Sequence, residues 1–521
     1  MTPAPSLAMN GQHEAVDSPD FQRLHPLSIV LKSAAAIGQN LIAMGVLYFS
    51  IFDQNILYTS LAALGLLVLI VGVTALIWSR FTYQIQAKEI RIKSGLISRN
   101  NRSIPFDRIQ DVSLEQKLVS RLLGLATVKL ETGASAGEDG KLDALALRDA
   151  QALRDRVRDY KSGKTAENSN AEETVGERPE TAERTPIFAM DNRRIFIAGL
   201  FNFSFVLLAI LAAIAQNLDF LLPDDFFNPW YWAEQLSEQQ VVNGLSLAAQ
   251  IAGAVGALIS LIAVGIGSGI IRTFIREYGF RLDRVDTGQP GFRRRRGLFT
   301  LTDMVMPIHR VQAALLRTGP VRQHFGWYHL KFQSLASDGS GESDHSAAPC
   351  AQLEEIAPIL SESGIANISA ELEFHAVNPA LWWRGAIIVT LGLAAIALGN
   401  GLFVHSGLFG LIFLTVPISF YLYLNWRYHR YALSDTQLFV RSGWWRRKLT
   451  ILPLRKVQTV DIGQSPLDHP LDLATVTIGV AGGSILGPLT INAIPIATAK
   501  TLRQNLIAAV HTIVQRKVIG A

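Results

Sequence analysis

Two clusters of basic side chains are the residues of this sequence best suited to chemistry, because they could bind anionic groups. The clusters are Arg293, Arg294, Arg295 and Arg296, and Trp444, Trp445, Arg446, Arg447 and Lys448. We predict that both occupy equivalent β-hairpins, with Arg99 and Arg102 as a weaker counterpart. Each Lys or Arg near an anionic bilayer contributes about 1 kcal/mol of attraction, and Trp favours the headgroup region. The alternative is that these charges only set membrane topology or solvate an exposed hairpin.

Side chains that could catalyse a reaction or hold a metal form no recognisable set. His309, His324 and His329 lie close in sequence, but the single cysteine, Cys350, does not supply a second pair of zinc ligands. The sequence contains no phosphate-binding Walker loop, no zinc-protease helix motif and no Gly-x-Ser-x-Gly turn. We therefore expect no catalytic residues, no metal, no cofactor and no nucleic-acid partner.

A short motif with the pattern apolar-Pro-apolar-x-basic-β-branched-Gln occurs three times. Its recurring residues are Pro105, Arg108 and Gln110; Pro307, Arg310 and Gln312; and Pro453, Lys456 and Gln458. An aromatic residue, Tyr83, Phe280 or Tyr431, opens each copy at 22, 27 and 22 residues before the Pro, which predicts a five-residue insertion in the second copy. The repetition indicates one domain used three times, and we interpret the motif as structural.

The residues around each motif predict strands followed by one helix. Apolar and polar residues alternate over residues 83–86 and 90–93, as in half-buried strands. Residues 142–157 and 498–514 have the composition of amphipathic helices. Each repeat is therefore expected to form a small β-sandwich or barrel closed by a C-terminal helix.

Long apolar runs precede each predicted β domain. Charged residues make up only 17% of the chain, against about 25% in soluble domains, and a membrane span needs about 20 apolar residues. The predicted spans are residues 27–50, 56–78, 195–214, 245–271, 381–404 and 408–424. Gly265, Gly267 and Gly269 lie inside one of these runs, where small residues favour close helix packing.

The distribution of Lys and Arg predicts the orientation in the membrane. Three alternate loops, residues 51–55, 215–243 and 405–407, contain neither residue. Because positively charged loops stay in the cytoplasm, we expect both termini and all three β domains to be cytoplasmic, at a bacterial inner membrane. The first residues lack the features of a cleaved signal peptide.

The resulting organisation is a multi-pass α+β membrane protein with six spans in three helical hairpins, each followed by a β domain. The expected segments are a polar tail (1–26), a hairpin (27–78), a domain (79–157), a disordered linker (158–189), a hairpin (190–275), a divergent domain (276–368), a hairpin (379–427) and a domain (428–514). The linker is expected to be disordered because it has almost no apolar residues to bury.

The aromatic opener, the spacing to the Pro motif, the span pair before each domain and the segment at residues 24–28 together resemble a known family. The sequence is similar to bacterial membrane proteins with PH-like domains of the YdbS/YdbT type, with three tandem copies as in the YdbT subtype. The resemblance implies a PH-like fold, a β-sandwich or barrel closed at one end by a C-terminal helix. It also implies a role in the cell envelope, including resistance to membrane-active peptides, and no established catalytic residues.

Two functions of different classes remain. The first is a non-enzymatic scaffold whose PH-like domains bind anionic lipid headgroups or a protein partner, either a smaller homologue with a single PH-like domain or another copy of this chain. The second is a transporter or exporter subunit, or a membrane enzyme, that uses polar groups such as Gln39 and Asn40 within the spans. The predicted spans hold no ionisable groups beyond Lys32 and Arg384, both near the cytoplasmic ends, which favours the scaffold.

Overall fold

The computed structural model describes most of the chain and groups it into two compact units. The described residues are 21–38, 56–96, 98–132, 140–161, 186–203, 247–285, 290–334, 344–367, 372–403, 412–481 and 489–519. The first unit contains most of the residues up to 169, and the second contains the rest of the chain together with residues 111–118 and 131–139. The predicted disordered linker falls largely on residues 162–185, which lie outside the described part.

The first repeat contains seven strands and a closing helix. They are β1 (Gln22–Arg23), β2 (Thr82–Ile85), β3 (Glu89–Ser94), β4 (Asn100–Pro105), β5 (Ile109–Gln116), β6 (Leu125–Thr132), β7 (Gly140–Ala146) and α4 (Leu147–Lys161). The predicted alternation in β3 is confirmed, since Ile90 and Ile92 are buried and Arg91 and Lys93 are exposed. The helix predicted over residues 142–157 is wrong in its first part, which forms β7. An apolar run this short does not distinguish a strand from a buried helix by its pattern alone.

The second and third repeats have the same order of elements. The second comprises β8 (Phe188–Ala189), β9 (Arg281–Val285), β10 (Gly291–Arg296), β11 (Leu301–Pro307), β12 (Val311–Thr318), β13 (Tyr328–Ser334), β14 (Asp344–Ala351) and α11 (Leu353–Glu362). The third comprises β15 (His375–Ala376), β16 (Arg430–Leu433), β17 (Gln437–Ser442), β18 (Arg447–Pro453), β19 (Val457–Gly463), β20 (Leu473–Val480), β21 (Leu489–Pro495) and α14 (Ile496–Ile519).

A two-residue strand precedes the apolar helices of every repeat and pairs with the first strand that follows them. Gln22 lies opposite Tyr83, Phe188 opposite Leu282, and His375 opposite Tyr431. The helices are therefore inserted between the first two strands of each domain, and residues 22–23 belong to the first domain instead of a separate tail.

Leu282, not Phe280, occupies the position of the aromatic opener. It lies 15 residues before its Gly, against 12 in the other repeats, so the insertion is three residues instead of five.

The Pro motif forms the corner at which the chain crosses from the first sheet of a repeat to the second. Pro307 ends β11 and Pro453 ends β18, and each is followed by one 3-10 turn, η1 (Ile308–Arg310) or η3 (Leu454–Lys456). Within the corner, Gln312 Nε2 donates to Arg310 O at 2.9 Å. Lys456 Nζ donates to His309 O of the preceding repeat at 2.7 Å. The first contact shapes the corner of the second repeat, and the second contact connects the third repeat to the second.

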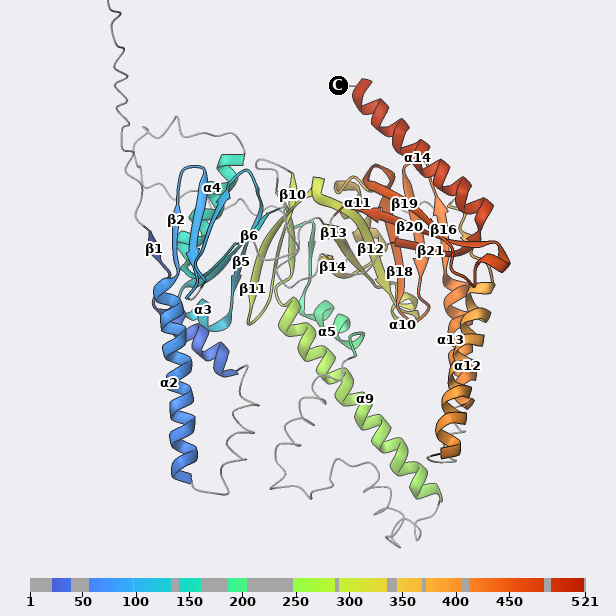
Figure 1. Ribbon diagram of the computed structural model, residues 1–521, viewed down its shortest axis with the longest axis horizontal. Coiled ribbons are helices and arrows are strands. Elements are labelled where there is room, and N and C mark those ends of the chain that lie inside the picture. Colours follow the sequence, from blue (N-terminus) through green and yellow to red (C-terminus); the bar gives the residue numbers. More distant parts are fainter. Residues whose placement is uncertain are drawn as a thin grey trace, which may run out of the picture. The chain divides into compact units, whose positions relative to one another are not determined.

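Within the part of the chain that the structure describes, three apolar helices have the length and composition to cross a membrane. Their windows are Ala63–Arg80 in α2 (Ile56–Arg80), Ile259–Glu277 in α9 (Leu247–Glu277) and Ala380–Gly399 in α12 (Ala380–Phe403). A shorter apolar helix spans Leu27–Gly38, α5 (Asn192–Leu200) packs on α9, and α13 (Thr415–Tyr428) runs beside α12 (Figure 1). The rest of the six predicted spans, and the loops 51–55, 215–243 and 405–407, lie outside the described residues.

Close packing at the glycine-rich part of α9 is confirmed. A Cβ at Gly269 would clash with the carbonyl oxygen of Asn202, and a Cβ at Gly265 would clash with the ring of Phe203. Both contacts join α9 to the residues that follow α5. Gly269 is therefore needed because another segment of backbone approaches the helix, and Gly265 because an aromatic ring does, whereas a Cβ at Gly267 would meet nothing within 4 Å.

One sheet in the second unit runs through the second and third repeats. Its order is β14-β13-β12-β18-β17-β16-β15, and β12 pairs antiparallel with β18. Phe439 and Ile451 of the third repeat lie in the core of the second repeat, whereas Ala313 of β12 lies in the core of the third. Each face of this sheet therefore covers a different hydrophobic core.

Candidate functional site

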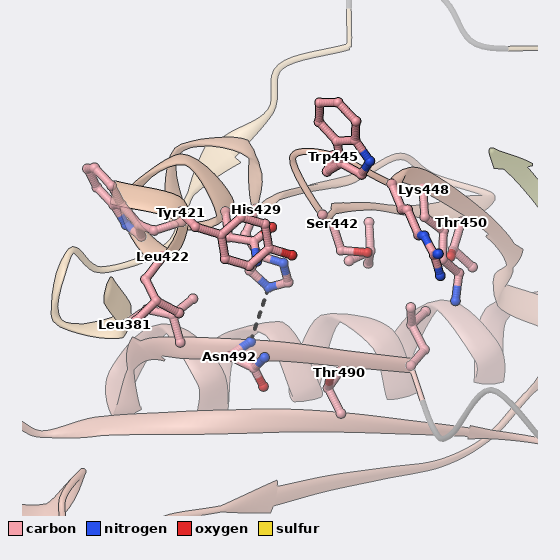
Figure 2. Close-up of a pocket in the computed structure, with 16 residues that line it drawn as sticks. Leu381, Tyr421, Leu422, His429, Ser442, Trp445, Lys448, Thr450, Thr490 and Asn492 are labelled. Atoms are coloured by element: carbon pink, nitrogen blue, oxygen red, sulfur yellow. Dashed lines mark hydrogen bonds between the residues drawn. The ribbon is translucent and has the colours of Figure 1, made fainter. Parts of the chain in front are cut away.

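A cleft of about 700 Å³ lies in the third repeat, where α12 and α13 meet the β domain. Figure 2 shows Leu381, Tyr421 and Leu422 on one side of it, Trp445 and Lys448 on the other, and Thr490 and Asn492 along its floor. The remaining lining residues are Asn425, Trp426, His429, Val440, Ser442, Gly443, Arg446, Thr450 and Leu489. The apolar helices supply one wall and a β-hairpin supplies the other.

The hairpin that carries the cationic wall is held against α13. Its turn joins β17 to β18 at Gly443, whose φ of 75° suits glycine. The backbone N–H of Trp444 donates to Asn425 Oδ1 at 2.8 Å. Trp445 and Arg446 in the turn are exposed, and Lys448 is half-buried. This contact to α13 keeps the two cations at the junction with the apolar helices.

The cleft contains a histidine that carries no charge at neutral pH. His429 follows α13, is buried, and its Nε2 accepts a hydrogen bond from the Asn492 backbone N–H at 3.4 Å. Burial lowers the pKa of His429 to about 4. The positive charge of the cleft therefore comes from Arg446 and Lys448. Together with the hydroxyl and amide groups of the floor and the apolar wall, it suits an amphipathic molecule with an anionic head.

The other residues of this cluster make structural contacts. Arg447 Nε donates to Trp444 O at 3.2 Å, and its guanidinium lies 4.7 Å from the centroid of the Tyr428 ring. Its Nη1 also donates to Gln323 Oε1 in the second repeat. Arg447 and Trp444 therefore shape the hairpin, whereas Trp445, Arg446 and Lys448 line the cleft.

The arginine run of the second repeat occupies a different position from the cluster of the third. Both clusters lie in the corresponding hairpin of their repeat, β10–β11 or β17–β18, as predicted. Their positions within that hairpin differ, because residues 293–296 lie on β10, before the turn glycine, whereas residues 446–448 follow it. Arg293 Nε donates to Asp303 Oδ1 at 2.8 Å, and Arg296 Nη1 to Glu277 Oε1 at 3.0 Å. Arg294 is buried and Arg295 is exposed. Three of the four arginines thus lie against groups of their own domain. Arg99 and Arg102 of the first repeat are exposed.

Comparison with known proteins decides the family. The bacterial PH domain family matches residues 31–161, 243–364 and 386–510, which together make up most of the chain. This chain belongs to that family. The three matches confirm the threefold repeat and the resemblance seen in the sequence. Each match also includes apolar helices, in agreement with their insertion into the domain.

One curated relative of this bacterial PH-domain protein is the transmembrane protein YdbT of Bacillus subtilis (strain 168). The two are 24% identical over 341 residues, which is 62% of this chain and 64% of that protein. The match thus spans less than two thirds of the relative's length. No solved structure matches the chain. The protein is accordingly a membrane protein with three bacterial PH domains.

The histidines and the cysteine of the second PH domain have separate surroundings. His329 Nε2 lies 2.9 Å from Ser346 Oγ, and the ring of His324 packs edge-on against Phe325. Cys350 is buried, and burial raises the pKa of its thiol. Among the residues that the structure describes, no three His, Cys, Asp or Glu side chains are grouped to hold a metal ion.

Each PH domain also carries an exposed apolar segment that sequence reasoning missed. We call these segments the apolar tips. They join β5 to β6, β12 to β13 and β19 to β20, and they contain α3 (Leu118–Leu122), α10 (Pro320–His324) and η4 (His469–Leu471), respectively. Leu122 is 79% exposed, Phe325 58% and Leu467 56%. Two tips touch apolar helices, since the Phe325 ring lies 6.1 Å from Phe201 and Leu467 O accepts from Arg384 Nη1 at 3.1 Å. In the sequence, the sign of these tips is the presence of large apolar residues within a turn.

Proposed function

We propose that this protein is a non-enzymatic, membrane-anchored scaffold whose PH domains bind anionic lipid headgroups at the inner leaflet. The observation that carries the proposal is the cleft of the third domain. Arg446 and Lys448 line one wall of it, and the apolar residues Leu381 and Leu422 of α12 and α13 line the opposite wall. A phospholipid combines an anionic head with apolar chains, and it would meet both walls at once.

The apolar tips support contact with the bilayer. Exposed apolar patches mark interaction surfaces, and each tip gathers at least two exposed apolar side chains: Leu118 and Leu122, Val321 and Phe325, or Leu467 and Leu471. Phe325 lies beside Phe201 at the end of α5, and Leu467 contacts Arg384 of α12. Insertion of such tips would add an attraction that salt does not screen, whereas the attraction of the cleft would weaken as salt rises. We further propose six spans in three hairpins, cytoplasmic domains and termini, and a role in maintaining the cell envelope or protecting it from membrane-active peptides.

The proposal is tested with the full-length protein in detergent. Native mass spectrometry would measure binding of phosphatidylglycerol and of the zwitterionic phosphatidylcholine. We expect tighter binding of phosphatidylglycerol, and the double variant Arg446→Gln/Lys448→Gln should weaken it by about 10- to 30-fold, because each cation contributes about 1 kcal/mol.

A matched control removes the same charge elsewhere. The variant Arg295→Gln/Arg99→Gln neutralises two exposed arginines outside the cleft and should leave lipid affinity nearly unchanged. An equal loss in both variants would assign the attraction to overall charge. Equal affinity of the unaltered protein for the two lipids would refute recognition of anionic headgroups.

A further inference from the structure

The junctions between strands of successive repeats follow one register. In the junction of β12 with β18, Thr318 lies opposite Arg447 and Leu316 opposite Leu449. In the junction of β5 with β11, Gln116 lies opposite Leu301 and Leu114 opposite Asp303. In both, a residue n positions before the motif Pro faces the residue n positions after the motif Gln. Successive repeats therefore pair edge to edge in the same register.

Within the described part of the chain, one strand equivalent to each side of these junctions lies at the edge of its sheet. β4 corresponds to β11 and β18 and is the last strand of the sheet β1-β2-β3-β4, while β19 corresponds to β5 and β12 and begins the sheet β19-β20-β21. The first six residues of β12 are buried, whereas Gln458, Thr459, Asp461 and Gly463 of β19 are exposed. Residues 100–103 of β4 are exposed as well. An exposed strand edge is a template for pairing with another chain.

We propose that β19 of one molecule pairs with β4 of a second copy, in the register of the internal junctions. That register places Arg102 of one copy, three positions before Pro105, opposite Asp461 of the other, three positions after Gln458. The corresponding pair in the β12–β18 junction is Thr450 opposite Leu315, which carries no charge. Opposite charges directly across a strand pair stabilise it, and like charges destabilise it.

The occupant is a second copy because the chain itself presents both complementary edges. The charges at Arg102 and Asp461 would oppose pairing of β4 with β4 or of β19 with β19, and they favour pairing of one kind with the other. Such a contact joins unlike surfaces, so it extends into a ring or an open row of molecules. It uses main-chain hydrogen bonds between strands and does not depend on lipid binding.

Disulfide cross-linking in membranes tests the register. Two full-length copies with different tags are produced together, one with Asn100→Cys and the other with Gly463→Cys, at exposed positions that the register places opposite one another. A Cβ at Gly463 meets nothing within 4 Å, and the native Cys350 is buried. We expect a mixed-tag disulfide dimer. The control uses Ser94→Cys on β3, which pairs with Asn100 and lies one strand further away, beyond the roughly 7 Å that a disulfide bridges between Cα atoms.

Charge exchange tests the choice of partner. Arg102→Asp in the Asn100→Cys copy should lower the cross-linked fraction by about five-fold. Adding Asp461→Arg to the Gly463→Cys copy should restore it, and this recovery excludes misfolding as the cause of the loss. The proposal is overturned by a mixed-tag yield no greater than that of the Ser94→Cys control, by failure of the second exchange to restore it, or by cross-linking to a different membrane protein instead of the second copy.

Discussion

His429 shows how a residue at the end of an apolar helix is adapted to its surroundings. Its ring is buried beneath the cleft and accepts a hydrogen bond from the Asn492 N–H. A protonated imidazole could not accept this bond and would carry a charge into a desolvated site. Burial therefore lowers the pKa of His429 to about 4, and the neutral ring links the end of α13 to β21.

This pKa predicts how the stability of the third PH domain depends on pH. The unfolded chain takes up the proton near pH 6.5 and the folded domain only near pH 4, so the unfolded state binds more protons in between. The free energy of unfolding should thus fall by up to about 3 kcal/mol as pH drops through this range. Hydrogen exchange of β21 measures it. His429→Gln should flatten the pH dependence, and His375→Gln, at an exposed histidine of the same domain, should not. Identical slopes in wild type and His429→Gln would contradict the prediction.

At the same scale, the sequence singles out the two basic clusters by residue type but does not reveal their surroundings. Trp445, Arg446 and Lys448 line a cleft, and the Pro motif, which we interpret as structural, lies at a corner between two sheets. The sequence groups Arg293 and Arg296 with the cleft residues, because a run of arginines does not show which of them form ion pairs within the domain. Their partners, Asp303 and Glu277, are 10 and 19 residues away. The pairing of β10 with β11 brings Arg293 to Asp303, and Arg296 meets Glu277 at the end of α9.

Between elements, ion pairs join apolar helices to the β domains in each repeat. Lys32 Nζ lies 3.3 Å from Asp143 Oδ2 in the first, Arg296 Nη1 lies 3.0 Å from Glu277 Oε1 in the second, and Arg384 pairs with Asp468 in the third. Glu277, the last residue of α9, has a side chain that is only 1% exposed. It also accepts from Arg276 Nε at 2.8 Å. Its charge is thus desolvated and depends on both arginines.

Removing one partner of this pair should loosen the second PH domain. Arg296→Met leaves the buried Glu277 carboxylate with one cation fewer, and breaking a buried ion pair costs about 3 kcal/mol or more. Faster hydrogen exchange of β10 in the full-length protein would report the loss. Arg295→Met, at the exposed neighbour on the same strand, is the control and should change local stability by less than about 0.5 kcal/mol. Equal exchange rates in the two variants would show that the pair does not hold the strand.

The long, regular elements were predictable from the sequence, and the short ones were not. The alternation in β3 and the apolar length of α2, α9 and α12 are local patterns that span many residues. The strands β1, β8 and β15 have two residues each, too few to show a period. The identity of Leu282 as the counterpart of Tyr83 depends on its pairing with Phe188. Phe188 precedes the inserted helices in the sequence, so the residues around Leu282 do not reveal this pairing.

Across the second unit, the shared sheet makes the second and third PH domains mutually dependent. Phe439 and Ile451 belong by sequence to the third repeat but lie in the core of the second. A fragment limited to residues 428–514 would expose both side chains and would also lack β15. The sequence repeat ends within this sheet, whereas the folded unit includes strands on both sides of the junction. Experiments on single domains therefore need boundaries taken from the sheet.

The arrangement of the whole chain in the membrane is the largest prediction. Because the loops at residues 51–55, 215–243 and 405–407 contain no Lys or Arg, they should lie on the side opposite the PH domains. Alkaline phosphatase fused after Trp230 should be active, since the enzyme matures outside the cytoplasm, and a fusion after Thr165 should be inactive. Green fluorescent protein at the same two positions is the control and should give the opposite pattern. Active phosphatase after Thr165 would place the PH domains outside the cytoplasm and remove them from the inner leaflet, where the proposed headgroup site must act.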